Sequence, residues 1–169
     1  KIQRPEIRSI IEIDLDILQD LAGFVENRIH NGWNFRPRMM VEEFRKAIRK
    51  ELDFAQEANH LKKFKSNFRD IKYIRVPEVY WELTTSTVLT MEFIDGIKIN
   101  EVNQAQYAGL YDPKLVAVRC AEAMLKQVLE DGFFHADPHP ANLFVKPPAN
   151  IVMLDVGMVG YLDKRTKIS

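Results

Sequence analysis

The stretch FFHADPHPANLFV, residues 133–145, sets two histidines, an aspartate and an asparagine between two apolar runs. His135, Asp137 and His139 alternate along the chain, so on a β-strand they would share one face and could bind one metal ion. The two prolines of the stretch cannot join a strand ladder, which indicates a loop in which that shared face is lost. A histidine-ligated metal is therefore the weaker interpretation of this stretch.

The spacing of the polar residues indicates a different chemistry. His135, Asp137 and Asn142 follow the pattern H-x-D-x-x-x-x-N, which phosphoryl-transfer enzymes of the kinase type use in their catalytic loop. In such a loop the aspartate receives or orients the proton of the acceptor hydroxyl, and the asparagine binds Mg²⁺ through its amide oxygen. We therefore predict that Asp137 is catalytic and Asn142 is a metal ligand, with His135 and His139 supporting the loop.

This interpretation requires a hairpin that ends in a second carboxylate. The following residues, NLFVKPPANIVMLDVG, consist of two apolar runs joined by PPAN, and they end in Asp155 and Gly157. Asp155 then occupies the place of the aspartate in the D-F-G motif, which bridges the nucleotide phosphates through a metal ion. A lone D-x-G is weak evidence, but Asp137, Asn142 and Asp155 separated by such a hairpin form a specific pattern.

The composition excludes several other classes of protein. The 169 residues are 46% hydrophobic, enough for a domain with a core, and carry 24 basic and 24 acidic side chains. Because the formal net charge is zero, the sequence does not predict binding to nucleic acid. The single cysteine, Cys120, excludes an internal disulfide and a cysteine-rich zinc site. No apolar run is long enough for a transmembrane segment, so membrane contact would come through regions outside this chain.

Helical periodicity dominates the first third of the chain. Residues 6–29 are predicted to form a helix, followed by a loop that contains Gly32 and Pro37. Residues 39–64 repeat the helical period as a second long helix, or as two helices joined end to end. The first helix is predicted from apolar side chains that recur every three to five residues, namely Ile10, Ile13, Ile17, Leu21, Phe24 and Ile29.

The pattern changes to β-structure near Val76. Residues 76–83 and 86–94 are β-branched and aromatic runs, which predict an antiparallel hairpin. A helix is expected next over residues 113–131, with Asp112 as its cap and Gly132 at its end. Three short apolar runs, FFH, NLFVK and IVMLD, are predicted strands.

The end of the hairpin is a candidate hinge between two lobes. In VLTMEFIDG, Met91 lies at the predicted strand end, and Glu92 and Ile94 follow it. Backbone groups there could hydrogen-bond an adenine edge, which requires no particular side chain. We predict Met91, Glu92 and Ile94 as nucleotide-binding residues, although an ordinary strand exit would look the same.

These motifs together resemble the UbiB/ADCK family of atypical kinase-like ATPases, which is linked to ubiquinone and related isoprenoid-quinone pathways. The segments that carry the resemblance are KIQRP, KELDFAQEAN, MEFIDG, HADPHPANLF and LDVG, and they extend over nearly the whole chain. The resemblance implies an α+β, two-lobed, protein-kinase-like fold present as a fragment. Residues 1–95 would hold part of the N-lobe with its hairpin, and residues 96–169 the catalytic-loop part of the C-lobe.

The resemblance also assigns roles to residues. Lys1 would contact the nucleotide phosphates and Glu57 would be its ion-pair partner. Glu51 and Asp53 match the E-x-D pair, a regulatory element that meets an N-terminal K-x-G-Q segment in relatives. On a regular helix Glu51 lies about 200° from Asp53, so either the helix breaks there or only part of the pair points inward.

The chain departs from the family pattern in three respects. Ala141 replaces the usual Gly, and Val156 replaces the usual Phe after the metal-binding aspartate. The alanine-rich loop over the nucleotide and the K-x-G-Q segment would precede Lys1. We therefore expect these 169 residues alone to be inactive or nearly so.

The implied function is Mg-ATP binding, with ATPase or phosphotransferase activity that supports ubiquinone biosynthesis. Expected partners are the nucleotide, a lipid or quinone precursor, and proteins of quinone biosynthesis. The expected location is the cytoplasm or an organellar matrix, peripheral to a membrane. A small-molecule phosphotransferase of the aminoglycoside or choline kinase type stays an alternative, although the E-x-D pair speaks against it. A pseudokinase scaffold is the other alternative.

Overall fold

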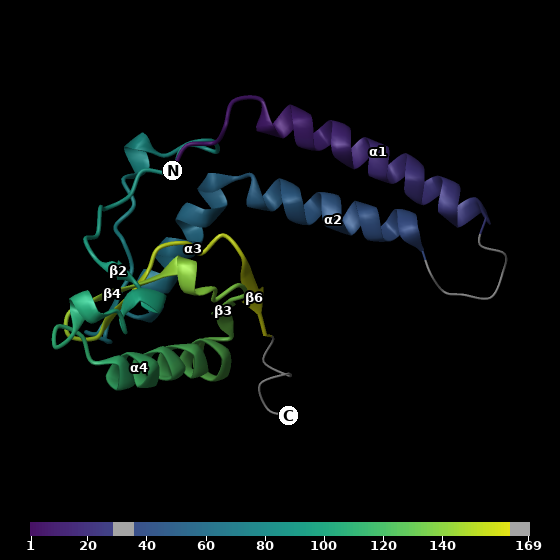
Figure 1. Ribbon diagram of the computed structural model, residues 1–169. Coiled ribbons are helices and arrows are strands. Elements are labelled where there is room, and N and C mark those ends of the chain that lie inside the picture. Colours follow the sequence, from purple (N-terminus) through teal and green to yellow (C-terminus); the bar gives the residue numbers. More distant parts are fainter. Residues whose placement is uncertain (29–35, 163–169) are drawn as a thin grey trace.

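The structure is a computed structural model that describes residues 1–28 and 36–162. Gly32 of the predicted loop lies outside these ranges, whereas Pro37, also predicted in the loop, is the first residue of a helix. Figure 1 shows a compact body of short strands and helices from which a long helical hairpin extends. The helices are α1 Ile7–Arg28, α2 Pro37–Glu51, α3 Phe54–Asn67 and α4 Pro113–Leu125, and the strands are β1 Ile74–Arg75, β2 Ile97–Lys98, β3 Phe133–His135, β4 Leu143–Lys146, β5 Asn150–Met153 and β6 Val159–Tyr161.

The extended hairpin is formed by α1 and α2, which lie side by side (Figure 1). Charged side chains join them: Arg45 of α2 donates to Glu12 at 3.1 Å and to Asp16 at 2.9 Å. The predicted first helix is thus confirmed, but much of its apolar stripe is not buried. Because α1 contacts α2 on one side, the apolar side chains that remain exposed include Ile10, Ile13, Ile17, Leu21 and Phe24.

The second helical stretch, predicted as one long helix or as two joined end to end, consists of two helices. The break falls at Leu52 and Asp53, between α2 and α3. The Asp53 carboxylate caps α3 by accepting a hydrogen bond from the Ala55 N–H at 3.1 Å. An aspartate at this position satisfies one of the free N–H groups at a helix start. The helix therefore breaks within the E-x-D pair, which is the first of the two possibilities that the spacing of about 200° left open.

The predicted C-terminal hairpin forms the centre of a four-stranded sheet with the order β1-β5-β4-β2. β4 and β5 are antiparallel, with Leu143 opposite Met153. β1 pairs with β5 in parallel and β2 pairs with β4 antiparallel. A second sheet joins β3 to β6. The predicted strands FFH, NLFVK and IVMLD are confirmed, whereas β1, β2 and β6 were not predicted.

The two runs over residues 76–94 do pair antiparallel, but they form no continuous ladder. Their contact is an isolated bridge between Val79 and Met91. The Tyr80 N–H donates to the Thr90 carbonyl at 2.9 Å on one side of it. A 3₁₀ turn at Trp81–Leu83 then ends the pairing. The predicted hairpin is confirmed in direction, and the turn explains its short extent.

Helix α4 begins and ends close to the predicted positions. The Asp112 carboxylate caps it by accepting from the Leu115 N–H at 3.0 Å, and Gly132 follows the helical region with a φ of 61°, in the left-handed region that favours glycine. Between them, Lys126–Asp131 form a π-helical turn. This turn places the buried Gln127 so that its side-chain oxygen accepts from the His135 N–H at 2.9 Å.

The core lies between α3 and the four-stranded sheet. Leu61 and Phe64 of α3 are fully buried, as are Val145 and Val152 of the central strands. Since β1 comes from the predicted first lobe and its partner β5 from the second, the four-stranded sheet draws on both. A lobe boundary at residue 95 therefore stays a prediction. No helix in the described ranges is long and apolar enough to cross a membrane.

Candidate active site

Three predicted residues from distant parts of the sequence meet in one ion-pair cluster. Lys1 Nζ lies 2.6 Å from Glu57 Oε1 and 2.8 Å from Asp155 Oδ2. The Lys1 backbone is held beside Leu89, whose N–H donates to the Lys1 carbonyl at 2.9 Å, and Ile2 forms an antiparallel bridge with Val88. Backbone pairing therefore fixes the position of the Lys1 main chain, and from there the side chain extends to the two carboxylates.

The three charged groups of this cluster differ in burial, and their pKa values are shifted in different directions. Burial alone would lower the pKa of Lys1, but hydrogen bonds and charges from Asp155 and Glu57 outweigh it and raise that pKa. Burial raises the pKa of Glu57, which is only 5% exposed, and Lys1 opposes this only in part. Burial would also raise the pKa of Asp155, but Lys1 lowers it overall. The half-exposed Asp155 is thus the carboxylate that is most easily kept charged.

Helix α3 fixes the turn that carries Asp155. The Val156 N–H donates to Glu57 Oε1 at 3.5 Å, and His60 Nδ1 donates to the Val156 carbonyl at 3.0 Å. Both groups of the Val156 backbone are therefore held by side chains of one helix. His60 was not predicted as part of the site. Its position three residues after Glu57 places the two on neighbouring positions of one helix face, a spacing that could have identified it.

The predicted catalytic loop is supported by its histidines, as the sequence indicated. His135 Nδ1 accepts from the Asp137 N–H at 3.2 Å, and His139 Nδ1 accepts from the Ala141 N–H at 3.1 Å. Burial lowers the pKa of His135, although the backbone and carboxylate of Asp155 and the charge of Asp137 oppose this. A neutral ring suits a histidine whose Nδ1 accepts a hydrogen bond.

Asn142 is hydrogen-bonded to the backbone of Asp137 and to that of Leu154, the residue before Asp155. Its side-chain Nδ2 donates to the Asp137 carbonyl at 3.3 Å, and its own carbonyl accepts from the Leu154 N–H at 3.2 Å. The residue before Asp155 is therefore hydrogen-bonded directly to Asn142. The Asp137 side chain is exposed, so it can face an acceptor.

The oxygen atoms of Asn142 and Asp155 suit an Mg²⁺ ion that binds together with a nucleotide. The Asn142 amide donates through its nitrogen, which leaves its oxygen to bind a cation, and Asp155 offers a half-exposed carboxylate. Within residues 1–28 and 36–162, no three His, Cys, Asp or Glu side chains gather as a metal cluster. Mg²⁺ is commonly held by one or two protein oxygens together with substrate phosphates and water, which is the set that these residues could complete.

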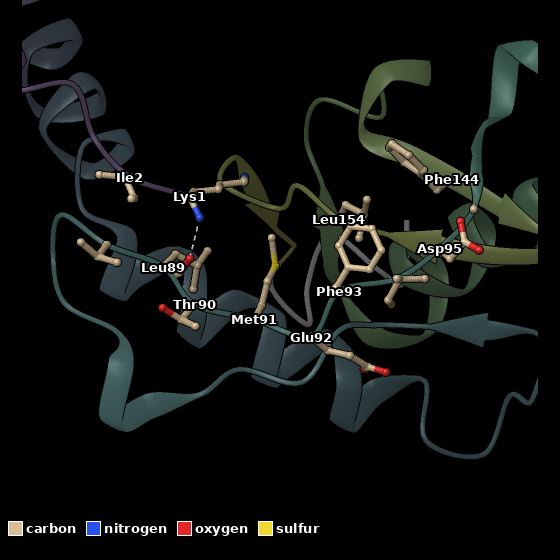
Figure 2. Close-up of a pocket in the computed structure, with 13 residues that line it drawn as sticks. Lys1, Ile2, Leu89, Thr90, Met91, Glu92, Phe93, Asp95, Phe144 and Leu154 are labelled. Carbon is tan, nitrogen blue, oxygen red and sulfur yellow. Dashed lines mark hydrogen bonds between the residues drawn. The ribbon is translucent and has the colours of Figure 1, made fainter.

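An apolar hollow of about 530 Å³ runs from Lys1 along residues 88–96 (Figure 2). Phe144 and Leu154 line it from the C-terminal hairpin. Volumes of this size and an apolar lining with a few polar groups are typical of small-molecule sites. The predicted hinge residues Met91, Glu92 and Ile94 all line this hollow.

The three hinge residues do not present the same backbone groups. The Glu92 N–H donates to the Glu78 carbonyl at 2.7 Å, so this donor is used within the fold. The backbones of Met91 and Ile94 make no backbone hydrogen bond to any other described residue. Backbone recognition of an adenine edge would thus fall to Met91 and Ile94 rather than to the amide of Glu92.

The structure separates the two members of the E-x-D pair. Asp53 uses its carboxylate to cap α3, whereas Glu51 lies beside the turn after Asp155. A Cβ atom added to Gly157 would lie 2.7 Å from Glu51 Oε1, so a larger residue would displace this carboxylate. Glu51 also borders a second hollow of about 440 Å³, which reaches Ala136 at the catalytic loop.

Comparisons with known proteins identify the family of the chain. The family model of the ABC1 atypical kinase-like domain matches residues 1–169. The uncharacterized protein sll1770 of Synechocystis sp. is 39% identical over 168 residues, which are 99% of this chain and 28% of that protein. Two chloroplastic proteins of Arabidopsis thaliana, ACTIVITY OF BC1 COMPLEX KINASE 8 and ACTIVITY OF BC1 COMPLEX KINASE 7, are each 36% identical over 167 residues. These matches cover 96% and 99% of this chain, and 22% and 24% of the two relatives.

Among solved structures, the complex of Rv3197 with erythromycin from Mycobacterium tuberculosis superposes with a TM-score of 0.73 at 22% identity. The match covers 95% of this chain and 39% of that one. This likeness and the family model confirm the predicted kinase-like fold of mixed helix and sheet. The chain spans about a quarter of the length of the curated relatives it matches.

Proposed function

The chain belongs to the ABC1 atypical kinase-like family, and from this premise we propose that the protein binds ATP with Mg²⁺ and hydrolyses it or transfers its phosphoryl group. The observation that carries the proposal is the position of Lys1 between Glu57 and Asp155. A kinase-like site requires a lysine held by a helix glutamate close to the aspartate that binds metal. We further propose that this activity supports the biosynthesis of ubiquinone or a related isoprenoid quinone.

Each residue then has a distinct task. Glu57, buried and bonded to both Lys1 and the Val156 N–H, holds the lysine and the turn together. On nucleotide binding, Lys1 would leave Asp155 and pair with the phosphates, and Asp155 and Asn142 would hold the metal. When bound, Mg²⁺ supplies positive charge that offsets the charge of the phosphates.

Asp137 serves the acceptor. Its side chain is exposed while its N–H and carbonyl are held by His135 and Asn142, so the loop is fixed and the carboxylate can reach a bound hydroxyl or water. It orients that group and receives its proton as the phosphoryl group is transferred. No part of this task requires the side chain of His139, which caps the 3₁₀ turn that follows.

We propose a lipid or quinone precursor and proteins of quinone biosynthesis as partners, at a membrane surface in the cytoplasm or an organelle. The direct test is ATP consumption by the complete polypeptide, with and without phospholipid vesicles and a phenolic quinone precursor. Asp137→Asn should keep Mg-ATP affinity within a few-fold and lower turnover by about 100-fold or more. Nucleotide binding without ATP consumption by the unaltered protein under any of these conditions would instead favour a scaffold.

A further inference from the structure

One aromatic side chain at the apolar hollow has no role in the fold. The Phe93 side chain is 91% exposed, the highest value among the exposed large hydrophobic side chains of the described residues. Burial of such a side chain would stabilise the protein, and the exposed Phe93 side chain makes no such contribution. Isolated exposed apolar residues are common, but Phe93 lies on the segment that lines the hollow of about 530 Å³.

The segment points Phe93 toward this hollow. Figure 2 shows Met91 and Phe93 projecting on the side that faces Leu154, whereas Glu92 projects the opposite way. This is the alternation of an extended chain, in which neighbouring side chains take opposite faces. Phe93 is therefore presented to the hollow as long as Glu92 is held on the far side.

Glu92 is held there by several bonds. Its carboxylate accepts from Arg75 and, at 3.3 Å, from the Glu78 N–H, while its own N–H donates to the Glu78 carbonyl. The Glu92 side chain is 27% exposed, so this anchor is partly shielded from water. The anchor fixes the backbone directly before Phe93 but leaves the exposed ring itself free to rotate.

The opposite wall of the hollow offers a second aromatic ring. Phe144 lines the hollow from β4, where it is paired with Val152 and is only partly exposed. Lys1 stands near the other end of the same lining. If the phosphates lie at Lys1, as the proposed function requires, the base of the nucleotide lies at the end that Phe93 and Phe144 share.

We propose that Phe93 is a nucleotide-binding residue whose ring stacks on the base and covers it against the side of Phe144. This inference rests on the proposed function and adds a residue that determines affinity. Stacking on an aromatic ring is tolerant of base identity, because every base has a π-face. Phe93 therefore contributes affinity for any purine nucleotide and none for a phosphate chain that lacks a base.

The test measures the dissociation constants of the complete polypeptide for Mg-ATP, Mg-GTP and Mg-tripolyphosphate. Phe93→Ala should weaken the binding of both nucleotides by about 5- to 100-fold, and it should change the affinity for tripolyphosphate by less than about twofold. Phe93→Trp should keep the affinity for nucleotides, because it keeps an aromatic face. Leu83→Ala is the matched control, since Leu83 is 59% exposed but does not line the hollow.

The outcomes separate the two proposals. Unchanged Mg-ATP affinity in Phe93→Ala, with tight binding by the unaltered protein, overturns the role of Phe93 and leaves the proposed function standing. Equal weakening of tripolyphosphate shows that the substitution disturbs the fold, which also overturns a stacking role. If the unaltered protein binds neither nucleotide, the proposed function fails, and the inference fails with it.

Discussion

Lys1 Nζ and Asp155 Oδ2 lie 2.8 Å apart, at opposite ends of the described chain. The same lysine nitrogen lies 2.6 Å from Glu57, so one cation serves two carboxylates of unequal burial. In the proposed function the pair with Asp155 opens when nucleotide and metal bind, while the pair with Glu57 persists. In that proposal the Lys1–Asp155 pair is a resting contact that competes with the ligand and holds the Asp155 carboxylate in position before the metal binds.

Removal of the lysine should destabilise the protein through Glu57. Lys1→Met leaves a carboxylate that is 5% exposed without its cation, and we expect the free energy of unfolding to fall by about 1–3 kcal/mol, less than for a fully buried pair because Lys1 is itself partly exposed. Urea denaturation measures this. Glu57→Gln added to Lys1→Met should recover part of the loss, since the unpaired charge is then removed. A double variant that is as unstable as the sum of both single variants would contradict this account of the cluster.

The two members of the E-x-D pair should behave differently. Asp53→Ala removes the cap of α3 and should cost about 0.5–2 kcal/mol of unfolding free energy, whereas Asp53→Ser keeps a capping oxygen and should cost little. Glu51→Gln is the matched control, because Glu51 is exposed and caps no helix. If Asp53→Ser changes ATP turnover without a change in stability, the Asp53 charge has the regulatory role that the family resemblance implies. Equal stability of Asp53→Ala and Asp53→Ser would contradict the capping role.

The stability of the protein should depend on the protonation of His135. Burial lowers its pKa below the ordinary value of 6.5, so the unfolded chain binds the proton more readily than the folded protein does. The contribution of neutral His135 to the free energy of unfolding is fully present above pH 6.5. It is lost as the pH falls through the pKa that His135 has in the folded protein. Protonation would also remove the Nδ1 acceptor of the Asp137 N–H.

The variant His135→Asn tests this dependence. Its side-chain oxygen can replace Nδ1 as the acceptor, but it does not titrate. Denaturation between about pH 8 and about pH 5 should show a smaller loss of stability for the variant than for the unaltered protein. Identical pH profiles of the two proteins would assign the acid sensitivity to other groups.

Local patterns in the sequence predicted much of the fold. Asp112 and Gly132 mark the limits of the α4 region because capping and left-handed backbone depend on single residue types. The strands β4 and β5 were predicted because apolar runs separated by a short turn favour a hairpin. β1 and β6 have only two and three residues, so their pairing depends on tertiary contacts rather than on a local pattern.

The candidate site was predicted by motif spacing and family resemblance more than by periodicity. The pattern from His135 to Asn142 is local, and the structure confirms the hydrogen bonds of both loop histidines. The meeting of Lys1 with Asp155 spans the chain, and no local pattern indicates it. His60 was missed because its partner is a backbone carbonyl, so only its spacing from Glu57 could have indicated its role.

The proposed function depends most on the claim that Asp155 binds Mg-ATP through the metal. Isothermal titration of the complete polypeptide with ATP, in Mg²⁺ and after its removal by a chelator, measures this directly. We predict that Mg²⁺ strengthens ATP binding by the unaltered protein and by Asp137→Asn by about 10-fold or more, and that Asp155→Asn loses this Mg²⁺ effect. Mg-ATP affinity that is unchanged in Asp155→Asn would contradict the claim.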